Sequence, residues 1–315
     1  MRRLIECVPN FSEGRDSNRI EALTAAMSGV KGAWVLDVHS DPDHNRSVIT
    51  LAGEPDAVAE TALRGVAKAA ELIDLRRHTG EHPRIGAVDV LPFVPIQGVT
   101  MEDCVALARE SGQEIWARCQ IPVYLYEEAA LRPERKRLEG VRNGEFEYLC
   151  GEVMRNTDRA PDIGGPALHP SAGAVAVGAR KFLIAYNINL DTPDVSIAKT
   201  IARLIRFSNG GLPHVKAIGI ALKKRQLAQV SMNLTDFEET PIHRVFDVVR
   251  LEATRHGCGI HSSEIVGLVP RRALDVNEAT YLQLEDFPPA NKILEDRLET
   301  KINAEGTYGI PLRSI

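Results

Sequence analysis

The sequence predicts an α/β (α+β) protein made of two ferredoxin-like sandwiches, each a β-sheet with helices on one face. Three observations lead to this fold. The length of 315 residues suits two domains of about 150 residues each. Segments with helical periodicity alternate with short apolar runs that are typical of strands. The order β-α-β-β-α-β occurs twice, which predicts one subdomain at residues 1–180 and a second at residues 181–315.

The first half contains one such unit followed by an extra helix and strand. A polar turn, DPDHN, separates two of its apolar runs and indicates a hairpin. Strands are predicted at residues 3–11, 32–40, 46–53, 86–96 and 122–129, and helices at residues 16–27, 55–75 and 101–119.

The pattern restarts near residue 181. Pro241 is predicted at the first position of a helix, where its missing N–H costs no hydrogen bond. Residues 155–174 are rich in glycine and proline and read either as an ordered functional loop or as a linker. Strands are predicted at 181–190, 215–224, 227–237 and 263–270, helices at 196–207 and 241–256, and further helices in the last fifty residues.

Composition excludes several classes of protein. The net charge of −5 and the pI of about 6.0 argue against nucleic-acid or anionic-membrane binding. The five cysteines form no Cys-x-x-Cys pair, so neither a disulfide framework nor a zinc knuckle is expected. No apolar run reaches about 18 residues and no signal peptide is recognisable, so a cytoplasmic protein is predicted.

The densest group of titratable residues is the segment RRHTGEHPRIGAVD, residues 76–89. His78 and His82 are four residues apart, but Gly80 and Pro83 prevent the helix that a zinc pair with this spacing would need. Pro83 favours an extended backbone at His82, which would project the imidazole away from the local chain. Histidine suits proton transfer near neutral pH. An exposed histidine without a role remains the alternative.

A second polar segment is DVHSDPDHNR, residues 37–46. It lacks the sharp-turn glycine and the distal glutamate of a calcium loop, so no metal is predicted. Asn45 and Arg46 are better interpreted as recognition groups at the start of a strand, because arginine binds carboxylates in a bidentate manner.

Two further features suit a flat ligand. The run IGGPALHPSAGA does not match a phosphate loop, but its small residues allow backbone amides to approach a flat or anionic molecule; plain turn chemistry is the alternative. Asn187 and Asn189 alternate with apolar residues and therefore share one face of a strand. Their side-chain amides could hydrogen-bond a pteridine-like ring, or could instead stabilise the turn at the end of the strand.

Five collinear segments resemble the glutamate formiminotransferase family, over about residues 3–285. They are ECVPNFSEG, DHNRSV, RHTGEHPRIGAVDVLPFVP, GARKFLIAYNINL and QVSMNLTDFEET. The resemblance implies two α/β subdomains with folate in a cleft or tunnel between them, and a homodimer. The implied reaction exchanges a formimino group between N-formimino-L-glutamate and tetrahydrofolate, a step of histidine degradation. Tetrahydrofolate is then the one-carbon carrier, no metal is needed, and a separate cyclodeaminase is a possible partner.

The resemblance also implies site residues. His82, in the Gly-Glu-His-Pro-Arg motif, is the expected catalytic residue. Arg46 and Arg84 are our candidates for the substrate carboxylates, because a dianion in a cleft needs fixed cations. Supporting roles are expected for Asn45, Asn187, Asn189 and His39; the last stands where animal members carry an acidic residue. The expected folate-binding residues are Ile163, Gly164, Gly165, Pro166, Ala167, Leu168, His169, Pro170, Ser171 and Ala172.

Other functions stay open from sequence. A formyltransferase acting on 5-formyltetrahydrofolate and glutamate cannot be distinguished by sequence from a formiminotransferase. The reason is that the formyl carbonyl oxygen and the formimino nitrogen are nearly isosteric. A folate-binding or storage protein without catalysis is a second alternative, which the intact Gly-Glu-His-Pro-Arg motif disfavours. A third is a metal-dependent hydrolase that would use His39, Asp41, His44 and His78.

Overall fold

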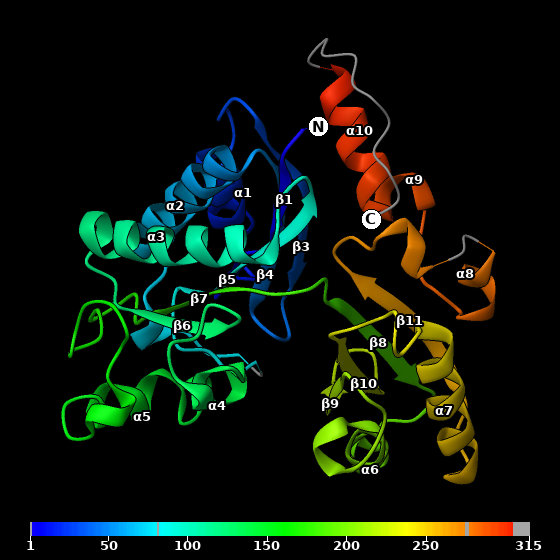
Figure 1. Cartoon of the computed structure of the whole chain (residues 1–315). Coiled ribbons are helices and arrows are strands. Elements are labelled where there is room, and N and C mark those ends of the chain that lie inside the picture. The colour runs from blue at the N-terminus through cyan, green and yellow to red at the C-terminus, as the bar shows by residue number, and fades with distance from the viewer. Residues whose placement is uncertain (1, 81, 275–276, 305–315) are drawn as a thin grey trace. The chain divides into compact units, whose positions relative to one another are not determined.

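The structure is a computed structural model, and it describes residues 2–80, 82–274 and 277–304. Glu81 of the Gly-Glu-His-Pro-Arg motif therefore lies outside the described residues. The chain divides into two compact units, Met1–Arg180 and Lys181–Ile315. Each unit has its own sheet (Figure 1). Each also has its own hydrophobic core.

The first unit is built on a seven-stranded sheet. β1 and β2 both lie between β4 and β5, so the predicted strand 3–11 is interrupted around Pro9, which has no N–H to donate. β3, β4, β1/β2 and β5 pair in an antiparallel manner, whereas β5, β7 and β6 are parallel. The strands are β1 (Leu4–Cys7), β2 (Asn10–Phe11), β3 (Ala33–Asp41), β4 (Arg46–Gly53), β5 (Val88–Gln97), β6 (Val123–Glu127) and β7 (Val175–Ala179).

Three long helices cover one face of this sheet, and α2 and α3 lie side by side there (Figure 1). α1 (Ser17–Ala26) begins where the Asp16 carboxylate accepts the N–H groups of Asn18 and Arg19. α2 (Pro55–Leu72) starts with proline, and α3 (Met101–Cys119) starts with a capping box at Thr100. Two short helices, α4 (Leu138–Arg142) and α5 (Glu145–Glu152), follow β6.

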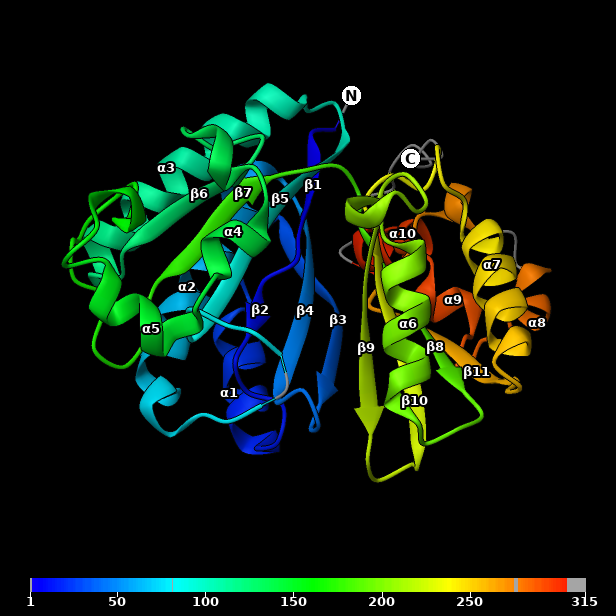
Figure 2. The same ribbon diagram turned by 90° about the horizontal axis from the view of Figure 1, so that it is seen from below.

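The second unit is a four-stranded antiparallel sheet in the order β11-β8-β10-β9 (Figure 2). Its core lies between the sheet and the helices α6 and α7, around Tyr186, Val230 and Phe246. Pro241 is the cap residue before α7 rather than its first helical residue. The elements are β8 (Ile184–Leu190), α6 (Val195–Ile205), β9 (Val215–Leu222), β10 (Leu227–Leu234), α7 (Ile242–Arg255), β11 (Ile260–Val266), α8 (Glu278–Tyr281), α9 (Pro289–Lys292) and α10 (Leu294–Ala304).

The prediction of an α/β protein with two sheets is confirmed, and the ferredoxin-like label stays a prediction. The sequence did not indicate β7, whose residues VAVGA are all buried between β5 and β6. A strand covered on both faces has no alternation of polar and apolar residues to reveal it. Among the described helices, none is long and apolar enough to cross a membrane.

Candidate functional site

A pocket in the first unit lies where β2, the β3–β4 turn and the loop before β5 meet. Its free volume is about 10 Å³, room for about one water molecule. Several residues predicted from sequence are brought together here although the chain separates them. The pocket is lined by Phe11, Ser12, His44, Asn45, Arg46, His78, His82, Arg84 and Asp89.

His82 is half-buried in this pocket. Its Nδ1 lies 2.8 Å from the carbonyl oxygen of Pro83, which can only accept, so Nδ1 carries the ring hydrogen. Nε2 is then the nitrogen that carries the lone pair, and it accepts a hydrogen bond from Nη1 of Arg46. Burial, followed by the positive charges of Arg46 and Arg142, holds the pKa of His82 well below its ordinary value. At neutral pH the imidazole is therefore uncharged and able to accept a proton.

Arg46 is the first residue of β4, and its guanidinium lies against the His82 ring, with Nη1 2.7 Å from Nδ1. Its Nε donates to Oδ1 of Asn10 at 2.8 Å, and Nη2 contacts the same oxygen. Burial and the neighbouring Arg142 lower the pKa of Arg46 to about 9, so it still carries its charge at neutral pH. Asn10 was missed as a site residue; a polar side chain within an apolar strand was its signal.

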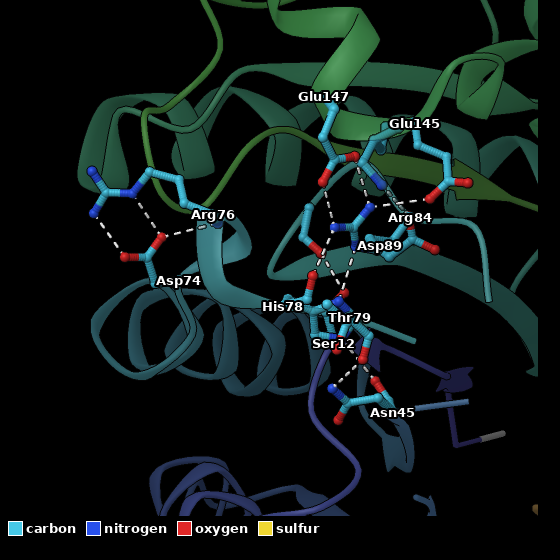
Figure 3. Close-up of polar contacts among 12 residues, drawn as sticks. Ser12, Asn45, Asp74, Arg76, His78, Thr79, Arg84, Asp89, Glu145 and Glu147 are labelled. Carbon is cyan, nitrogen blue, oxygen red and sulfur yellow. Dashed lines mark hydrogen bonds and ion pairs between the residues drawn. The ribbon is translucent and has the colours of Figure 1, made fainter. Parts of the chain in front are cut away.

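Arg84 is buried, and its five N–H groups are all used within the protein (Figure 3). Nε donates to Nδ1 of His78 at 2.9 Å, and Nη2 donates to the His78 carbonyl at 3.2 Å. Nη1 donates to Glu145 and Glu147 at 3.0 and 2.9 Å, and Nη2 reaches Glu147 again at 2.7 Å. In this arrangement no N–H is left for a substrate carboxylate. Arg84 instead attaches the His82 loop to α5.

Asn45 braces the same loop from the other side (Figure 3). Its Oδ1 accepts the Gly14 N–H at 3.0 Å, and its Nδ2 donates to the Thr79 carbonyl at 2.9 Å. His78 completes the brace, because its Nε2 donates to the Asn45 carbonyl at 3.0 Å. Both polar ends of the Asn45 amide are thus engaged with backbone, which supports a positioning role.

Asp89, which lines the pocket, forms a largely buried ion pair with Arg142, which does not line it. Asp89 accepts the Ile85 N–H at 2.9 Å, and its other oxygen contacts Nη2 of Arg142. Arg142 ends α4, far along the chain, and no spacing in the sequence indicated it. His44 also lines the pocket: its ring centroid lies 6.1 Å from that of His82. Its buried Nε2 has no hydrogen-bond partner in the part of the chain that the structure describes.

The segment 163–172 has a paired stem and an exposed tip. Ile163 exchanges both backbone hydrogen bonds with Val123, at 2.9 and 3.1 Å. At its other end Ala172 accepts the Ala87 N–H at 2.9 Å, which joins the segment to the His82 loop. Residues 164–167 are exposed, and Gly164 and Gly165 have φ of 75° and 87°, a region that favours glycine.

The remaining predicted residues lie elsewhere. His39 is on β3 opposite Val48 and is not among the residues that line the pocket. In the second unit Asn187 donates to Glu264 at 2.9 Å and Asn189 donates to Ser262 at 3.0 Å, within a buried network of polar side chains on β8, β10 and β11.

One group within the described residues has the geometry of a metal site, namely His214, Asp236 and Glu239 of the second unit. Asp236 there already accepts Nζ of Lys181 at 2.7 Å. The four residues of the hydrolase alternative do not form such a group in the described ranges.

Comparisons with known proteins identify both units. One family model, described as "Formiminotransferase domain, N-terminal subdomain", matches residues 4–180, and another, "Formiminotransferase domain", matches residues 185–301. The chain is 46% identical over 299 residues to glutamate formimidoyltransferase of Streptococcus pyogenes, covering 95% of this chain and 99% of that protein. It is 48% identical over 303 residues to the same enzyme of Thermoplasma acidophilum, covering 96% and 99%. The formimidoyltransferase-cyclodeaminase of Mus musculus is 45% identical over 291 residues, covering 90% and 53%.

Proposed function

Because this chain belongs to the formiminotransferase family, we propose that it is a glutamate formimidoyltransferase. It transfers a formimino group between N-formimino-L-glutamate and tetrahydrofolate, and the products are 5-formiminotetrahydrofolate and L-glutamate. The observation that carries the proposal is the 46% and 48% identity to two enzymes of that name over almost their full length. The pocket agrees with it, since an uncharged histidine lies there beside an arginine.

Tetrahydrofolate supplies N5 as the nucleophile for the amidine carbon, and the residues present suit such a partner. Residues 164–167 are exposed, and their small side chains allow a flat ring to approach the backbone closely. The far end of this segment is hydrogen-bonded to the loop that carries His82. We therefore assign folate binding to residues 163–172. Supporting roles for Asn187 and Asn189, which are hydrogen-bonded to Glu264 and Ser262 within the second unit, stay predictions.

His82 is the proton carrier in this proposal. Its Nε2 lone pair takes the proton that N5 must lose, and it then returns this proton to the departing glutamate nitrogen. That nitrogen is a poor leaving group as an anion, so protonation is required before the C–N bond breaks. General acid–base help of this kind is worth roughly 10²–10⁴-fold in rate. A depressed pKa keeps His82 in the uncharged form in which it can begin the cycle.

Arg46 is the proposed partner of a glutamate carboxylate. Its contact with His82 places a fixed positive charge next to the group that serves the glutamate nitrogen. The α-carboxylate is attached to the carbon that bears this nitrogen, so Arg46 is suited to bind it. Arg84 is left out of the proposed substrate contacts because its donors are all engaged within the protein.

The decisive experiment compares donors. Purified protein is incubated with tetrahydrofolate and N-formimino-L-glutamate, and 5-formiminotetrahydrofolate is followed by its absorbance. In parallel, 5-formyltetrahydrofolate and glutamate are supplied, and N-formylglutamate is measured. We expect efficient formimino transfer and slow formyl transfer. Efficient formyl transfer alone would replace the proposed activity with the formyltransferase alternative, and tight folate binding without turnover would indicate a binding protein.

Further proposals concern the assembly. We assign the N-terminal transferase subdomain to residues 1–180 and the C-terminal one to residues 181–315, and we propose a cytoplasmic homodimer. The mouse relative's name joins a cyclodeaminase to the transferase, and we propose a cyclodeaminase as a partner of this protein. Sedimentation equilibrium checks the homodimer by its mass.

A further inference from the structure

We propose that Arg142 is the second carboxylate-binding cation of the site and that it binds the γ-carboxylate of N-formimino-L-glutamate. This inference rests on the proposed function, which requires a dianionic substrate. It replaces Arg84, the residue that the sequence suggested for this role. Arg142 lies at the end of α4, beyond the motif that contains His82 and Arg84.

The guanidinium of Arg142 is buried but only partly used. Its side chain is 13% exposed, and its contact is the ion pair from Nη2 to Asp89. Its Nε is buried and has no hydrogen-bond partner among the described residues. Buried polar groups in native proteins normally find a partner, because an unpaired donor has lost its water without replacement. A carboxylate oxygen of a bound substrate would supply the missing acceptor.

The positive charge of Arg142 acts on the two residues proposed for the reaction, Arg46 and His82. After burial itself, its positive charge contributes to lowering the pKa of Arg46 and, behind Arg46, that of His82. Asp89 offers one negative charge against the two guanidinium groups of Arg46 and Arg142, so these three residues together carry a net positive charge beside the neutral His82. A positively charged, partly desolvated pocket favours an anionic ligand.

Arg84, unlike Arg142, has no unused hydrogen-bond donor. Two glutamates neutralise its charge, and its five N–H groups are all hydrogen-bonded. Among the described residues around the pocket, the guanidiniums with unused capacity are therefore those of Arg46, which lines the pocket, and Arg142, which reaches it through its ion pair with the lining residue Asp89. Arg46 touches His82, the residue that serves the glutamate nitrogen, so Arg46 is assigned to the neighbouring α-carboxylate. The remaining γ-carboxylate is assigned to Arg142, whose planar fork suits bidentate binding.

The test measures binding, which does not depend on turnover. Dissociation constants of N-formimino-L-glutamate and of its γ-amide, N-formimino-L-glutamine, are determined by isothermal titration calorimetry. For the unmodified protein we expect the γ-amide to bind roughly 30-fold more weakly, the value of one charge-assisted hydrogen bond. In Arg142→Gln the γ-carboxylate loses its partner, so the two ligands should bind almost equally. Tetrahydrofolate affinity should stay within about threefold of the unmodified value.

Two further variants control for folding. Arg142→Gln leaves Asp89 buried without its cation, which can destabilise the fold. The double variant Asp89→Asn/Arg142→Gln keeps a neutral hydrogen-bonded pair and should lose the same discrimination between the two ligands. Arg76→Gln is the matched surface control, since Arg76 is exposed and its ion pair within the described residues is with Asp74 (Figure 3). This control should leave both dissociation constants unchanged.

Two results would overturn the assignment. One is a folded double variant that still prefers the γ-carboxylate ligand by the original factor. The other is an equal loss of affinity for both ligands in both Arg142 variants, which would mean that Arg142 only shapes the pocket. Failure of the proposed function is distinguished by the donor assay of the unmodified protein. A protein that binds N-formimino-L-glutamate through Arg142 but transfers nothing would refute the transferase activity alone.

Discussion

The two sides of the pocket treat their arginines differently. On the side of α5, Arg84 has two carboxylates and a histidine as partners, and its donors are all used. On the side of His82, Arg142 pairs with a single carboxylate, Asp89, whose charge also acts on Arg46, and a buried N–H of Arg142 has no acceptor within the described ranges. A saturated arginine holds the protein together, whereas an unsaturated one is available to a ligand. Residue type alone does not tell these roles apart.

The strongest way to sharpen this comparison is to remove the base on the unsaturated side. In His82→Ala we expect kcat to fall by roughly 10²–10⁴-fold, because the proton can no longer pass from N5 to the leaving nitrogen. Folate binding should be retained, since the 163–172 segment keeps its own backbone pairing. Initial rates give kcat, and titration calorimetry gives the folate affinity. Near-normal turnover in this variant would remove His82 from the mechanism.

Replacing Arg84, on the saturated side, should lower the stability of the fold and leave the preference for the γ-carboxylate ligand unchanged. Arg84→Gln leaves His78, Glu145 and Glu147 without their common partner. Because both glutamates are partly exposed, we expect a loss of about 1–3 kcal/mol in the free energy of unfolding rather than the larger cost of a fully buried pair. Urea denaturation monitors this loss. The ratio of affinities for N-formimino-L-glutamate and its γ-amide should not change; a collapse of that ratio would return Arg84 to the substrate site.

The sequence predicted site residues that lie in local polar segments, but not those that only the folded chain brings together. His82, Arg46 and Asn45 were found because each lies in a short polar segment next to a predicted strand, and local pattern is what sequence reveals. The partner of Asp89 was not found, because Arg142 is 53 residues away and only the folded chain brings them together. Most of the alternation of strands and helices was predicted correctly from periodicity. β7 was missed because a strand buried on both faces shows none.

The smallest effect that we predict is a change in pH dependence. Burial and the charges of Arg46 and Arg142 lower the pKa of His82 below its usual value of about 6.5. The acid limb of kcat/KM should therefore lie below about pH 6.5, with His82 already uncharged above it. In Arg46→Gln one positive charge is removed, so the pKa of His82 rises and the acid limb moves to higher pH. Rates measured from pH 4.5 to 8 locate the acid limb of the unmodified protein and that of Arg46→Gln.

Folding stability gives an independent measure of the same group. A histidine with a lower pKa in the folded state binds fewer protons there than in the unfolded chain. Its contribution to stability is therefore complete above the unfolded pKa of about 6.5 and is lost as pH falls through the folded pKa. Arg46→Gln raises the folded pKa of His82 toward its unfolded pKa. The free energy of unfolding of this variant should therefore depend less on pH between the two pKa values. Urea midpoints at matched pH values compare the two proteins, and an unchanged slope would mean that Arg46 does not act on His82.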